Sequence, residues 1–474
     1  MSTLLLEKID TLAAFDEKRT RLKNAWILVR DQKIESVGTG SPPDEAVDQR
    51  IDLSGHVVLP GFINTHHHLF QALLRNIPAL QDVALFDWLH TMYLLMSEVT
   101  DEAQYVSALV NQAELLLSGC TTNADHSYLR LNDMEHDTEI KAAREIGIRF
   151  HLARGSFSIG QSQGGLPPDH IVEDEDEILA DTERLIRAYH DPEPYAMTRI
   201  DNAPCSPFSI TPRLMRESIK MARKYGVGNH THLAESPDDD LYMLETYGKS
   251  SVEVAEDWGW VGPDVWYAHG VVLSDSDIEI MARTGTAVAH CPNSNMYTAA
   301  GCCRVRDLLR AGVTVGLAVD GSAANNASNM INEVRNALLL QRAFYGADAM
   351  SPTQALELAT IGGAKLLRRN DIGVIEAGRA ADLIAVNINQ LAMAGGMHDP
   401  VAGVVLCSPG KVDYTIVNGR VLVAKGELVG VDISALIERH NSLSQALVER
   451  TEKRYGLDLG GFSPRRAYPY DERA

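Results

Sequence analysis

The two ends of the chain share a strand pattern. Short runs in which apolar and polar residues alternate are separated by polar turns, and the last run contains the strong hairpin signal Asn418-Gly419. The predicted strands cover residues 25–30, 34–38, 382–387 and 414–423. Neither end has enough strands for a core of its own. We therefore expect residues 1–58 and 371–432 to pair into one small β-domain, a β-sandwich, with the rest of the chain inserted into it.

The middle of the chain, residues 59–370, alternates strand-like and helical stretches. The predicted helices cover residues 102–117, 174–189, 212–225 and 275–282, and the predicted strands cover residues 121–125, 149–153, 226–232, 265–269, 287–290 and 314–320. Strands that alternate with helices form a parallel sheet, and this many units over about 300 residues is typical of a (β/α)₈ barrel. Residues 433–474 are predicted to add an exposed C-terminal helix and a polar tail.

An open, doubly wound α/β sheet is the alternative fold. Its dinucleotide-binding form is disfavoured, because no G-x-G-x-x-G opens a helix after the first predicted strand.

Residues that commonly bind metals follow several of the predicted strands. The apolar run 59–68 ends in histidines, and in an extended chain His66 and His68 project to the same side. Other predicted strands end in His232, His269, His290 and Asp320. The strand ends of a barrel meet around one active site, so we expect these side chains to converge. Each alone is more simply a core histidine or a capping aspartate, but together they indicate a metal centre.

We assign His66, His68, His232 and Asp320 as ligands of one divalent metal ion. Imidazole nitrogens and a carboxylate oxygen are ligands that Zn²⁺ prefers, with Fe²⁺ as the alternative metal. A structural zinc site would be closed by its four ligands, whereas a catalytic site keeps an open position. A non-enzymatic scaffold that merely holds a metal is therefore the competing interpretation.

Glu235 argues for catalysis. It follows His232 by three residues and can lean over the metal without binding it. A metal lowers the pKa of its bound water from about 15.7 to about 7, and a carboxylate nearby can then carry the proton to the substrate. We assign Glu235 as the proton shuttle, with His269 and Asp320 as catalytic groups that orient the water and accept its proton.

Charge and composition narrow the partners and the compartment. The formal net charge of -21 disfavours nucleic acid and anionic membranes, which are bound by concentrated Lys and Arg. The six cysteines lie scattered without paired spacing, as in proteins of reducing compartments. No apolar run reaches the roughly 18 residues of a membrane span, and no signal peptide is indicated. We therefore expect a cytoplasmic protein.

The motifs together resemble the amidohydrolase superfamily, in its mononuclear cyclic-amidine deaminase branch. They are Pro60-Gly61 before His66-x-His68, His232-x-x-Glu235, Ala268-His269-Gly270, His290-Cys291-Pro292, Val319-Asp320-Gly321-Ser322 and Gly378-Arg379-Ala380-Ala381-Asp382. The resemblance implies a (β/α)₈ barrel, one Zn or Fe ion, a homo-oligomer, and hydrolytic replacement of an amino group on a nitrogen heterocycle. Binuclear relatives need a bridging lysine after the fourth strand, and residues 199–209, which we place there, contain none.

Further stretches are similar to bacterial 8-oxoguanine deaminases and to the related isoxanthopterin deaminases and hydroxyatrazine ethylaminohydrolases. They cover residues 64–71, 118–122, 154–156, 164–169 and 203–207. The resemblance implies deamination of an oxidised purine, with 8-oxoguanine giving urate and ammonia. A pterin, or an s-triazine that loses ammonia or an alkylamine, is the alternative substrate.

Four residues are assigned to the substrate. Gln71, one turn after His68, can read a ring carbonyl and N–H edge, and Trp88 can stack on a flat ring, as can Tyr128. Arg154 can meet a carbonyl or oxo group, and His290 completes the set. Asn293, Cys302 and Cys303 follow no family pattern that we can map, yet they are expected near the edge of the substrate.

Overall fold

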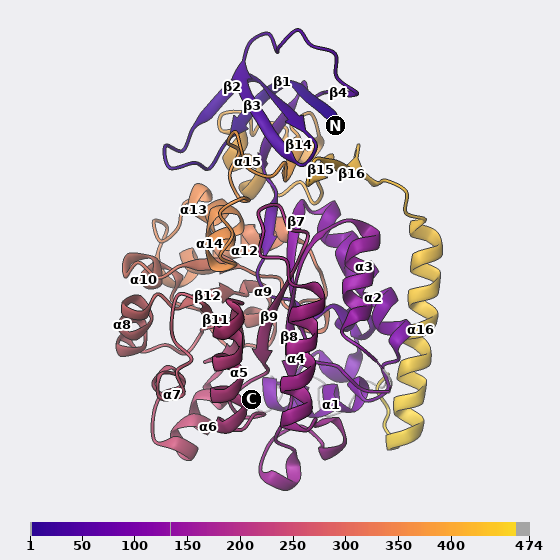
Figure 1. The fold of residues 1–474 in the computed structure, drawn as a ribbon, viewed down its shortest axis with the longest axis vertical. Helices are drawn as coiled ribbons and strands as arrows, with labels where there is room; N and C mark the ends of the chain where they lie inside the picture. The colour runs from indigo at the N-terminus through magenta and orange to yellow at the C-terminus, as the bar shows by residue number, and fades with distance from the viewer. Residues whose placement is uncertain (1, 133, 461–474) are drawn as a thin grey trace, which may run out of the picture.

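The computed structural model describes residues 2–132 and 134–460. The end of the predicted C-terminal tail, residues 461–474, lies outside the described residues. A barrel forms the larger part of the molecule, and a smaller sheet stands at one end of it (Figure 1). The predicted architecture, a (β/α)₈ barrel with a separate β-structure built from both chain ends, is confirmed.

Eight parallel strands close the barrel in the order β10-β11-β12-β13-β6-β7-β8-β9. They are β6 (Phe62–Asn64), β7 (Cys120–Ser127), β8 (Arg149–Ser156), β9 (Thr198–Pro204), β10 (Asn229–Leu233), β11 (Val265–His269), β12 (Ala287–His290) and β13 (Val315–Leu317). Nearly all their residues are buried, since helices cover the outside and side chains fill the inside. Several of these strands nevertheless carry polar residues, as in β7 and β10, because their side chains bond to one another inside the barrel.

Helices surround the barrel in the sequence order of the connections. The longer ones are α2 (Asp101–Leu117), α3 (Asp137–Ile146), α4 (Glu175–Tyr189), α5 (Pro212–Tyr225), α6 (Pro237–Tyr247), α7 (Ser251–Asp257), α8 (Asp275–Thr284) and α12 (Met330–Tyr345). The predicted helix 212–225 coincides with α5, which begins behind the N-cap Thr211 and ends at Gly226 in the left-handed conformation.

The second sheet has nine strands drawn from both chain ends. They are β1 (Thr3–Ala13), β2 (Arg21–Arg30), β3 (Lys33–Thr39), β4 (Gln49–Asp52), β5 (His56–Pro60), β14 (Leu383–Asn387), β15 (Tyr414–Val417), β16 (Arg420–Ala424) and β17 (Glu427–Leu428). The predicted hairpin lies between β15 and β16, where Asn418 and Gly419 both have positive φ, as a two-residue turn requires. A hydrophobic cluster separate from the barrel core stabilises this sheet.

The segment 59–68 was predicted as one strand, and this prediction is wrong. Its first two residues belong to β5, which pairs antiparallel with β14 of the second sheet. Gly61 then joins β5 to β6 of the barrel, and a Cβ at Gly61 would lie 2.1 Å from the Thr121 Oγ1 atom. The strand ends at Asn64, so His66 and His68 lie in the loop beyond it.

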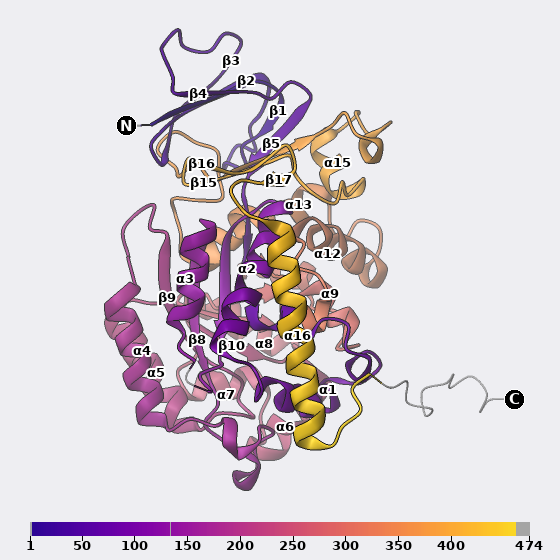
Figure 2. The same cartoon turned by 90° about the vertical axis from the view of Figure 1, so that its right-hand side faces the viewer.

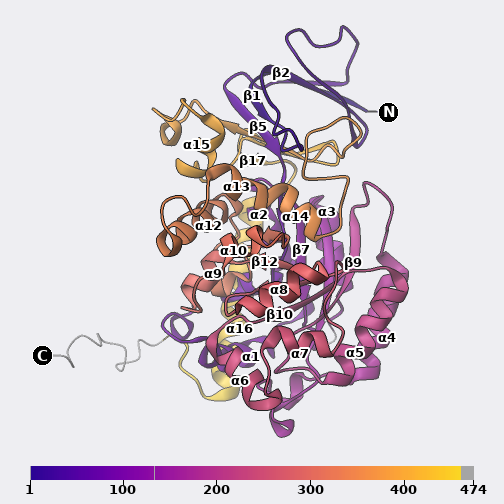
Figure 3. The ribbon, with the colours of Figure 1, turned by 90° about the vertical axis from the view of Figure 1, so that its left-hand side faces the viewer.

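The C-terminal helix α16 (Ile433–Tyr455) runs along the side of the barrel beside α2, with Leu447 buried beneath it (Figure 2). Between the barrel and the second sheet lie the short helices α13 (Pro352–Glu357) and α14 (Gly363–Leu366) (Figure 3). Among the described residues, no helix combines the length and the apolar character that crossing a membrane requires.

Candidate metal centre and active site

Three imidazoles and one carboxylate converge at the C-terminal mouth of the barrel. The Nε2 atoms of His68 and His232 lie 3.1 Å apart. The Oδ1 atom of Asp320 lies 3.2 Å from His66 Nε2 and 3.4 Å from His68 Nε2. Ligand atoms about 2.1 Å from a tetrahedral metal ion lie about 3.4 Å apart, so the spacing fits one such ion.

Hydrogen bonds to the other ring nitrogen fix each histidine with Nε2 toward the centre. His68 Nδ1 lies 2.9 Å from the carbonyl oxygen of His126, and His232 Nδ1 lies 2.8 Å from that of Cys205. These carbonyls can only accept, so the Nδ1 atoms donate and the Nε2 atoms keep their lone pairs. Outer contacts of this kind orient metal-binding histidines.

His66 is oriented through a second histidine. Its Nδ1 lies 2.7 Å from His230 Nε2, while His230 Nδ1 lies 3.1 Å from the carbonyl oxygen of Trp266. His230 therefore donates to that carbonyl and accepts from His66, which leaves the His66 Nε2 lone pair for a metal. That Nε2 atom is buried and makes no hydrogen bond within residues 2–132 and 134–460.

The electrostatics of the site suit a cation. Burial holds the pKa of His66, His68 and His232 below the ordinary value, so these rings are neutral. Burial alone would raise the pKa of Asp320, but its contact with His66, at 3.2 Å, and the charge of His269 hold it well below its usual range. Neutral imidazoles and an ionised carboxylate are the protonation states that a metal requires.

The residues present therefore fit one divalent metal ion. His126 belongs to the same cluster, within 4.8 Å of His66, His68 and His232, but its Nε2 lies 2.7 Å from the carbonyl oxygen of Ala203. Strand β9 contains no lysine at the position where a second metal would need a bridge.

Glu235 and His269 lie above the four donors. His269 Nε2 is 3.6 Å from Glu235 Oε1 and 3.9 Å from Asp320 Oδ2, and its Nδ1 is 2.9 Å from the side-chain oxygen of Asn295. Burial raises the pKa of Glu235. For His269, burial opposes protonation, but the charges of Glu235 and Asp320 outweigh it and raise the pKa. A carboxyl group with a raised pKa can both take up and release a proton near neutral pH.

The backbone at this mouth is held in an uncommon conformation. Ala234, His269 and Asp320 have φ values of 52°, 72° and 60°, in the left-handed region. Such positions cost about 1–3 kcal/mol each and cluster at functional sites. Two of these three residues, His269 and Asp320, are among the groups that converge at the centre.

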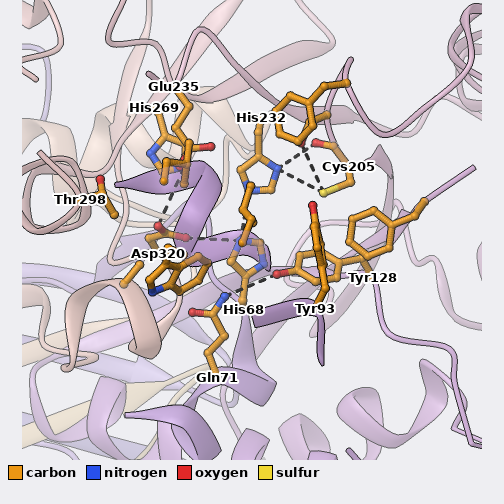
Figure 4. A pocket seen from close by; sticks show the side chains of 17 residues that line it. His68, Gln71, Tyr93, Tyr128, Cys205, His232, Glu235, His269, Thr298 and Asp320 are labelled. Carbon is orange, nitrogen blue, oxygen red and sulfur yellow. Dashed lines mark hydrogen bonds and ion pairs between the residues drawn. The ribbon is translucent and has the colours of Figure 1, made fainter. Parts of the chain in front are cut away.

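A pocket lined by aromatic side chains opens beside the donors (Figure 4). Its aromatic walls are Trp88, Tyr93, Tyr128, Phe157 and Phe208. Gln71, in the 3₁₀ helix η1 (Leu69–Leu74), also lines it, with its side-chain oxygen 3.1 Å from Ala323 N and its amide nitrogen 3.5 Å from the Tyr128 hydroxyl. The space left is about 40 Å³, so the pocket is largely filled by its own side chains. Trp88 comes from α1 (Leu85–Met96).

Two residues predicted to touch the substrate lie elsewhere. The guanidinium of Arg154 is buried and bound by Glu173 and Asp181, at 2.7 and 3.2 Å, and Arg154 does not line the pocket. His290 is buried at the end of β12 and also lies outside the pocket wall. Arg154 and His290 are thus not among the residues that line the pocket, and their contact with the substrate stays a prediction.

The three residues that follow no family pattern, Asn293, Cys302 and Cys303, also lie away from the pocket wall. Asn293 accepts a hydrogen bond from Asn336, and Gln341 donates to the carbonyl oxygen of Cys303 and contacts Cys302. These contacts join α12 to α9 (Pro292–Tyr297) and to the segment that follows α9, which is a packing role.

The sequence analysis missed His230, the residue that orients His66. The signal was present, because His230-x-His232 repeats the spacing of His66-x-His68. His230 was not predicted because it lies inside β10, two residues before His232, and not at the end of the strand.

Residues 57–422 match the amidohydrolase family. The chain belongs to this family. The predicted superfamily and the predicted class, a hydrolase that acts on carbon–nitrogen bonds, are thereby confirmed.

Several characterised amidohydrolases are similar over most of the chain. An 8-oxoguanine deaminase of Pseudomonas aeruginosa is 43% identical over 89% of this chain and 94% of its own. A hydroxydechloroatrazine ethylaminohydrolase of Pseudomonas sp. is 38% identical over 91% and 93%. An isoxanthopterin deaminase of an unknown prokaryotic organism is 36% identical over 88% and 90%. These are the three groups that the sequence motifs indicated.

A solved structure gives the same picture of the fold. The atrazine chlorohydrolase of Arthrobacter aurescens TC1, complexed with zinc, superposes with a TM-score of 0.90 and 33% identity. The match covers 93% of this chain and all of that one, 100%.

Proposed function

We propose that this amidohydrolase is a zinc-dependent deaminase that converts 8-oxoguanine and water into urate and ammonia. The observation that carries the proposal is the unliganded, buried Glu235 carboxyl beside a complete set of metal donors and a pocket with aromatic walls. The 43% identity to an 8-oxoguanine deaminase supports the choice of ring. The zinc in the structurally similar chlorohydrolase supports the choice of metal.

His66, His68, His232 and Asp320 would hold the metal in this proposal. When bound, the metal supplies Lewis-acid activation of water. Glu235 takes a proton from the attacking water and delivers it to the ring nitrogen next to the amino-bearing carbon. The oxygen of the water bonds to the amino-bearing carbon, and Asp320 accepts the second proton of the water. The amino group gains this proton, the C–N bond breaks and ammonia leaves, while the carbon keeps the oxygen as a carbonyl.

His269 is proposed to orient the attacking water. Its Nδ1 is fixed by Asn295, so its Nε2 faces both carboxylates, Glu235 and Asp320. A ring held in this way can orient the attacking water toward Asp320, which accepts a proton from it. Burial of all three groups strengthens these interactions, because little water screens them.

Gln71 and Trp88 are proposed to recognise the ring. The Gln71 amide presents both an acceptor and a donor, which matches a neighbouring carbonyl and N–H. The buried Trp88 Nε1 donates to nothing among the described residues, so its N–H is available for a ring carbonyl. Tyr128, next to Gln71, supplies a flat apolar surface.

The competing functions differ in ring and leaving group. Isoxanthopterin also has an amino-substituted C=N beside a carbonyl, and the isoxanthopterin deaminase is 36% identical. An s-triazine that releases an alkylamine is the other alternative, and the hydroxydechloroatrazine ethylaminohydrolase is 38% identical. A catalytically inactive scaffold would have no use for Glu235.

The proposal also covers partners and compartment. A small nitrogen heterocycle is the substrate, and nucleic acid and anionic membrane surfaces are disfavoured by the net charge of -21. All six cysteines are free thiols, which suits a cytoplasmic location. We propose a homo-oligomer on the family resemblance alone, and we retain the division into 1–58 with 371–432, 59–370 and 433–474 as a proposal for domains.

The decisive experiment uses protein of known zinc content and four substrates in parallel: 8-oxoguanine, isoxanthopterin, guanine and hydroxyatrazine. Released ammonia or ethylamine is measured together with the ultraviolet spectrum of the ring. Selective consumption of 8-oxoguanine, with urate formed in equal amount, is the expected result. Turnover of another ring would reassign the substrate, and no turnover of any ring by fully metallated protein would overturn the proposal.

A further inference from the structure

A second cavity lies at the opposite mouth of the barrel, about 540 Å³ in volume. It is lined by residues from the N-terminal ends of the strands, among them His151 of β8, Arg199 of β9 and Trp266 of β11. Lys365 of α14 and Arg368 close its other side, where Figure 3 shows α14 between the barrel and the second sheet. Pockets for small molecules have volumes of about 300–1,000 Å³.

The charge of this cavity is opposite to that of the whole protein. Arg199, Lys365 and Arg368 line it, and none of them forms an ion pair with a carboxylate of the described chain. A fourth cation, Arg369, is already balanced by Asp371 at 2.6 Å. Asp201 is the one carboxylate in the wall, so the cavity keeps an excess of positive charge. In a protein with a net charge of -21, this excess favours an anion.

Buried polar atoms in the wall lack partners. His151 is only 1% exposed, and its Nε2 makes no hydrogen bond within the part of the chain that the structure describes. The same holds for Arg199 Nε and for Trp266 Nε1 of the cavity wall. Leaving a buried polar group unpaired costs about 1–3 kcal/mol, so three such atoms around one cavity indicate a ligand that satisfies them.

The contacts of His151 indicate which hydrogen-bonding groups the ligand must carry. Its Nδ1 lies 3.0 Å from Asp201 Oδ2 and donates to it. Burial lowers the pKa of His151 to about 4, so the ring is neutral and Nε2 presents a lone pair. Arg199 and Trp266 offer only N–H donors. The wall therefore combines several donors for an anion with one acceptor for a hydroxyl group, which matches a phosphomonoester whose organic part carries a hydroxyl.

We propose that this cavity binds a small phosphomonoester, with Arg199, Lys365 and Arg368 around the phosphate and His151 accepting a hydrogen bond from a hydroxyl of its organic part. The volume favours an esterified phosphate over the free ion, because inorganic phosphate fills only a small part of about 540 Å³. The proposal is independent of the substrate of the metal centre.

The two sites are separated by the bottom of the barrel. The Trp266 ring stacks on His230, with centroids 4.8 Å apart and planes 15° from parallel. The Nε2 atom of His230 in turn contacts His66, one of the residues assigned to the metal. Trp266 thus faces the cavity on one side and the metal centre on the other. Its fluorescence can report on an occupant of the cavity.

The test measures binding to the zinc-loaded, full-length protein by calorimetry and tryptophan fluorescence at low salt. The probes are AMP, inorganic phosphate and, as the uncharged control, adenosine. We expect saturable one-to-one binding of AMP, weaker binding of phosphate and none of adenosine. In the Lys365→Gln/Arg368→Gln variant, affinity for AMP should fall by at least about tenfold, equivalent to about 1.4 kcal/mol.

The control is Arg216→Gln, which removes an exposed positive charge outside the cavity and should leave AMP affinity unchanged. Lys365 and Arg368 are exposed, so their replacement should not disturb folding, and equal thermal unfolding of the variants would establish this. Binding that is unaffected by the double variant would place the anion at the metal or elsewhere and overturn the proposal. Absence of saturable binding by both AMP and phosphate at millimolar concentrations would overturn it as well.

Discussion

Glu235 is positioned to move protons without binding the metal. Its carboxyl group is buried, 3.6 Å from His269 Nε2, and it belongs to neither group of converging ligand atoms. In Glu235→Gln the amide keeps the size of the side chain but cannot take up a proton. We expect the metal content to stay near that of the wild type and kcat to fall by about 10²–10⁴-fold.

Metal analysis and turnover measured on one preparation separate the two effects. The matched control is Glu279→Gln on the exposed face of α8, which should have no effect on either quantity. A Glu235→Gln enzyme with near-wild-type kcat would exclude Glu235 from proton transfer.

His230 acts through another residue, so its replacement should change metal affinity first. Phenylalanine keeps a ring stacked on Trp266 but removes the acceptor that faces His66 Nδ1 at 2.7 Å. Loss of such an outer contact typically weakens metal binding by about 10–100-fold. We expect this loss in His230→Phe, measured by competition with a chelator of known affinity.

The conservative variant distinguishes this positioning role from simple packing. In His230→Gln an amide oxygen can again accept from His66, so part of the affinity should return. If both variants retain wild-type zinc affinity, the contact does not tune the metal.

At the scale of elements, the sequence predicted the helices better than the strands. Amphipathic helices with caps, such as α5, have boundaries that local residues determine, including Thr211 and Gly226. The strand ends depend on pairing. Residues 59–60 pair with β14, more than 300 positions away, which no local pattern of the run 59–68 reveals.

The same limit applies to the site. The residues assigned as metal donors lie in or just beyond the C-terminal ends of barrel strands, where barrel geometry brings them together as expected. Arg154 also stands near a strand end, but it is neutralised by Glu173 and Asp181, which follow in a loop and a helix. Which of several nearby carboxylates forms an ion pair with a cation depends on the packing of side chains. The sequence pattern does not contain this information.

One buried ion pair joins the barrel to the second sheet. Arg149 of β8 contacts Asp382, just before β14, through two hydrogen bonds of 2.9 and 3.0 Å, and both side chains are almost fully buried. Removing one partner leaves an uncompensated buried charge, which typically costs about 3–5 kcal/mol. We expect Arg149→Met to lower the free energy of unfolding by this amount in urea titrations.

An exposed ion pair provides the comparison. Arg213, whose side chain is 55% exposed, pairs with Glu175 and Asp176, and pairs of this kind contribute about 0–1 kcal/mol. Arg213→Met should therefore have little effect. Equal losses in Arg149→Met and Arg213→Met would show that the buried pair does not hold the two sheets together.

Across the whole molecule, buried neutral histidines set the response to acid. Burial lowers the pKa to about 3 in His67, His136, His230 and His290, and to about 4 in His151. In the unfolded chain these rings take up protons below about pH 6.5. Between about pH 6.5 and the folded pKa values, the unfolded state thus binds more protons than the folded state, and stability falls as the pH falls.

This predicts that acid destabilisation begins near pH 6, well before carboxylates are protonated. Each buried histidine contributes a slope of up to about 1.4 kcal/mol per pH unit. His136 lies away from the metal donors and contacts Ser127 Oγ through Nδ1 at 2.8 Å, so asparagine can replace that contact without a titrating ring. We expect the plot of unfolding free energy against pH, between pH 7.5 and 5.0, to be shallower for His136→Asn by about this slope. Since zinc loss would affect both proteins equally, a slope identical to that of the wild type would mean that His136 does not stay neutral in the folded state.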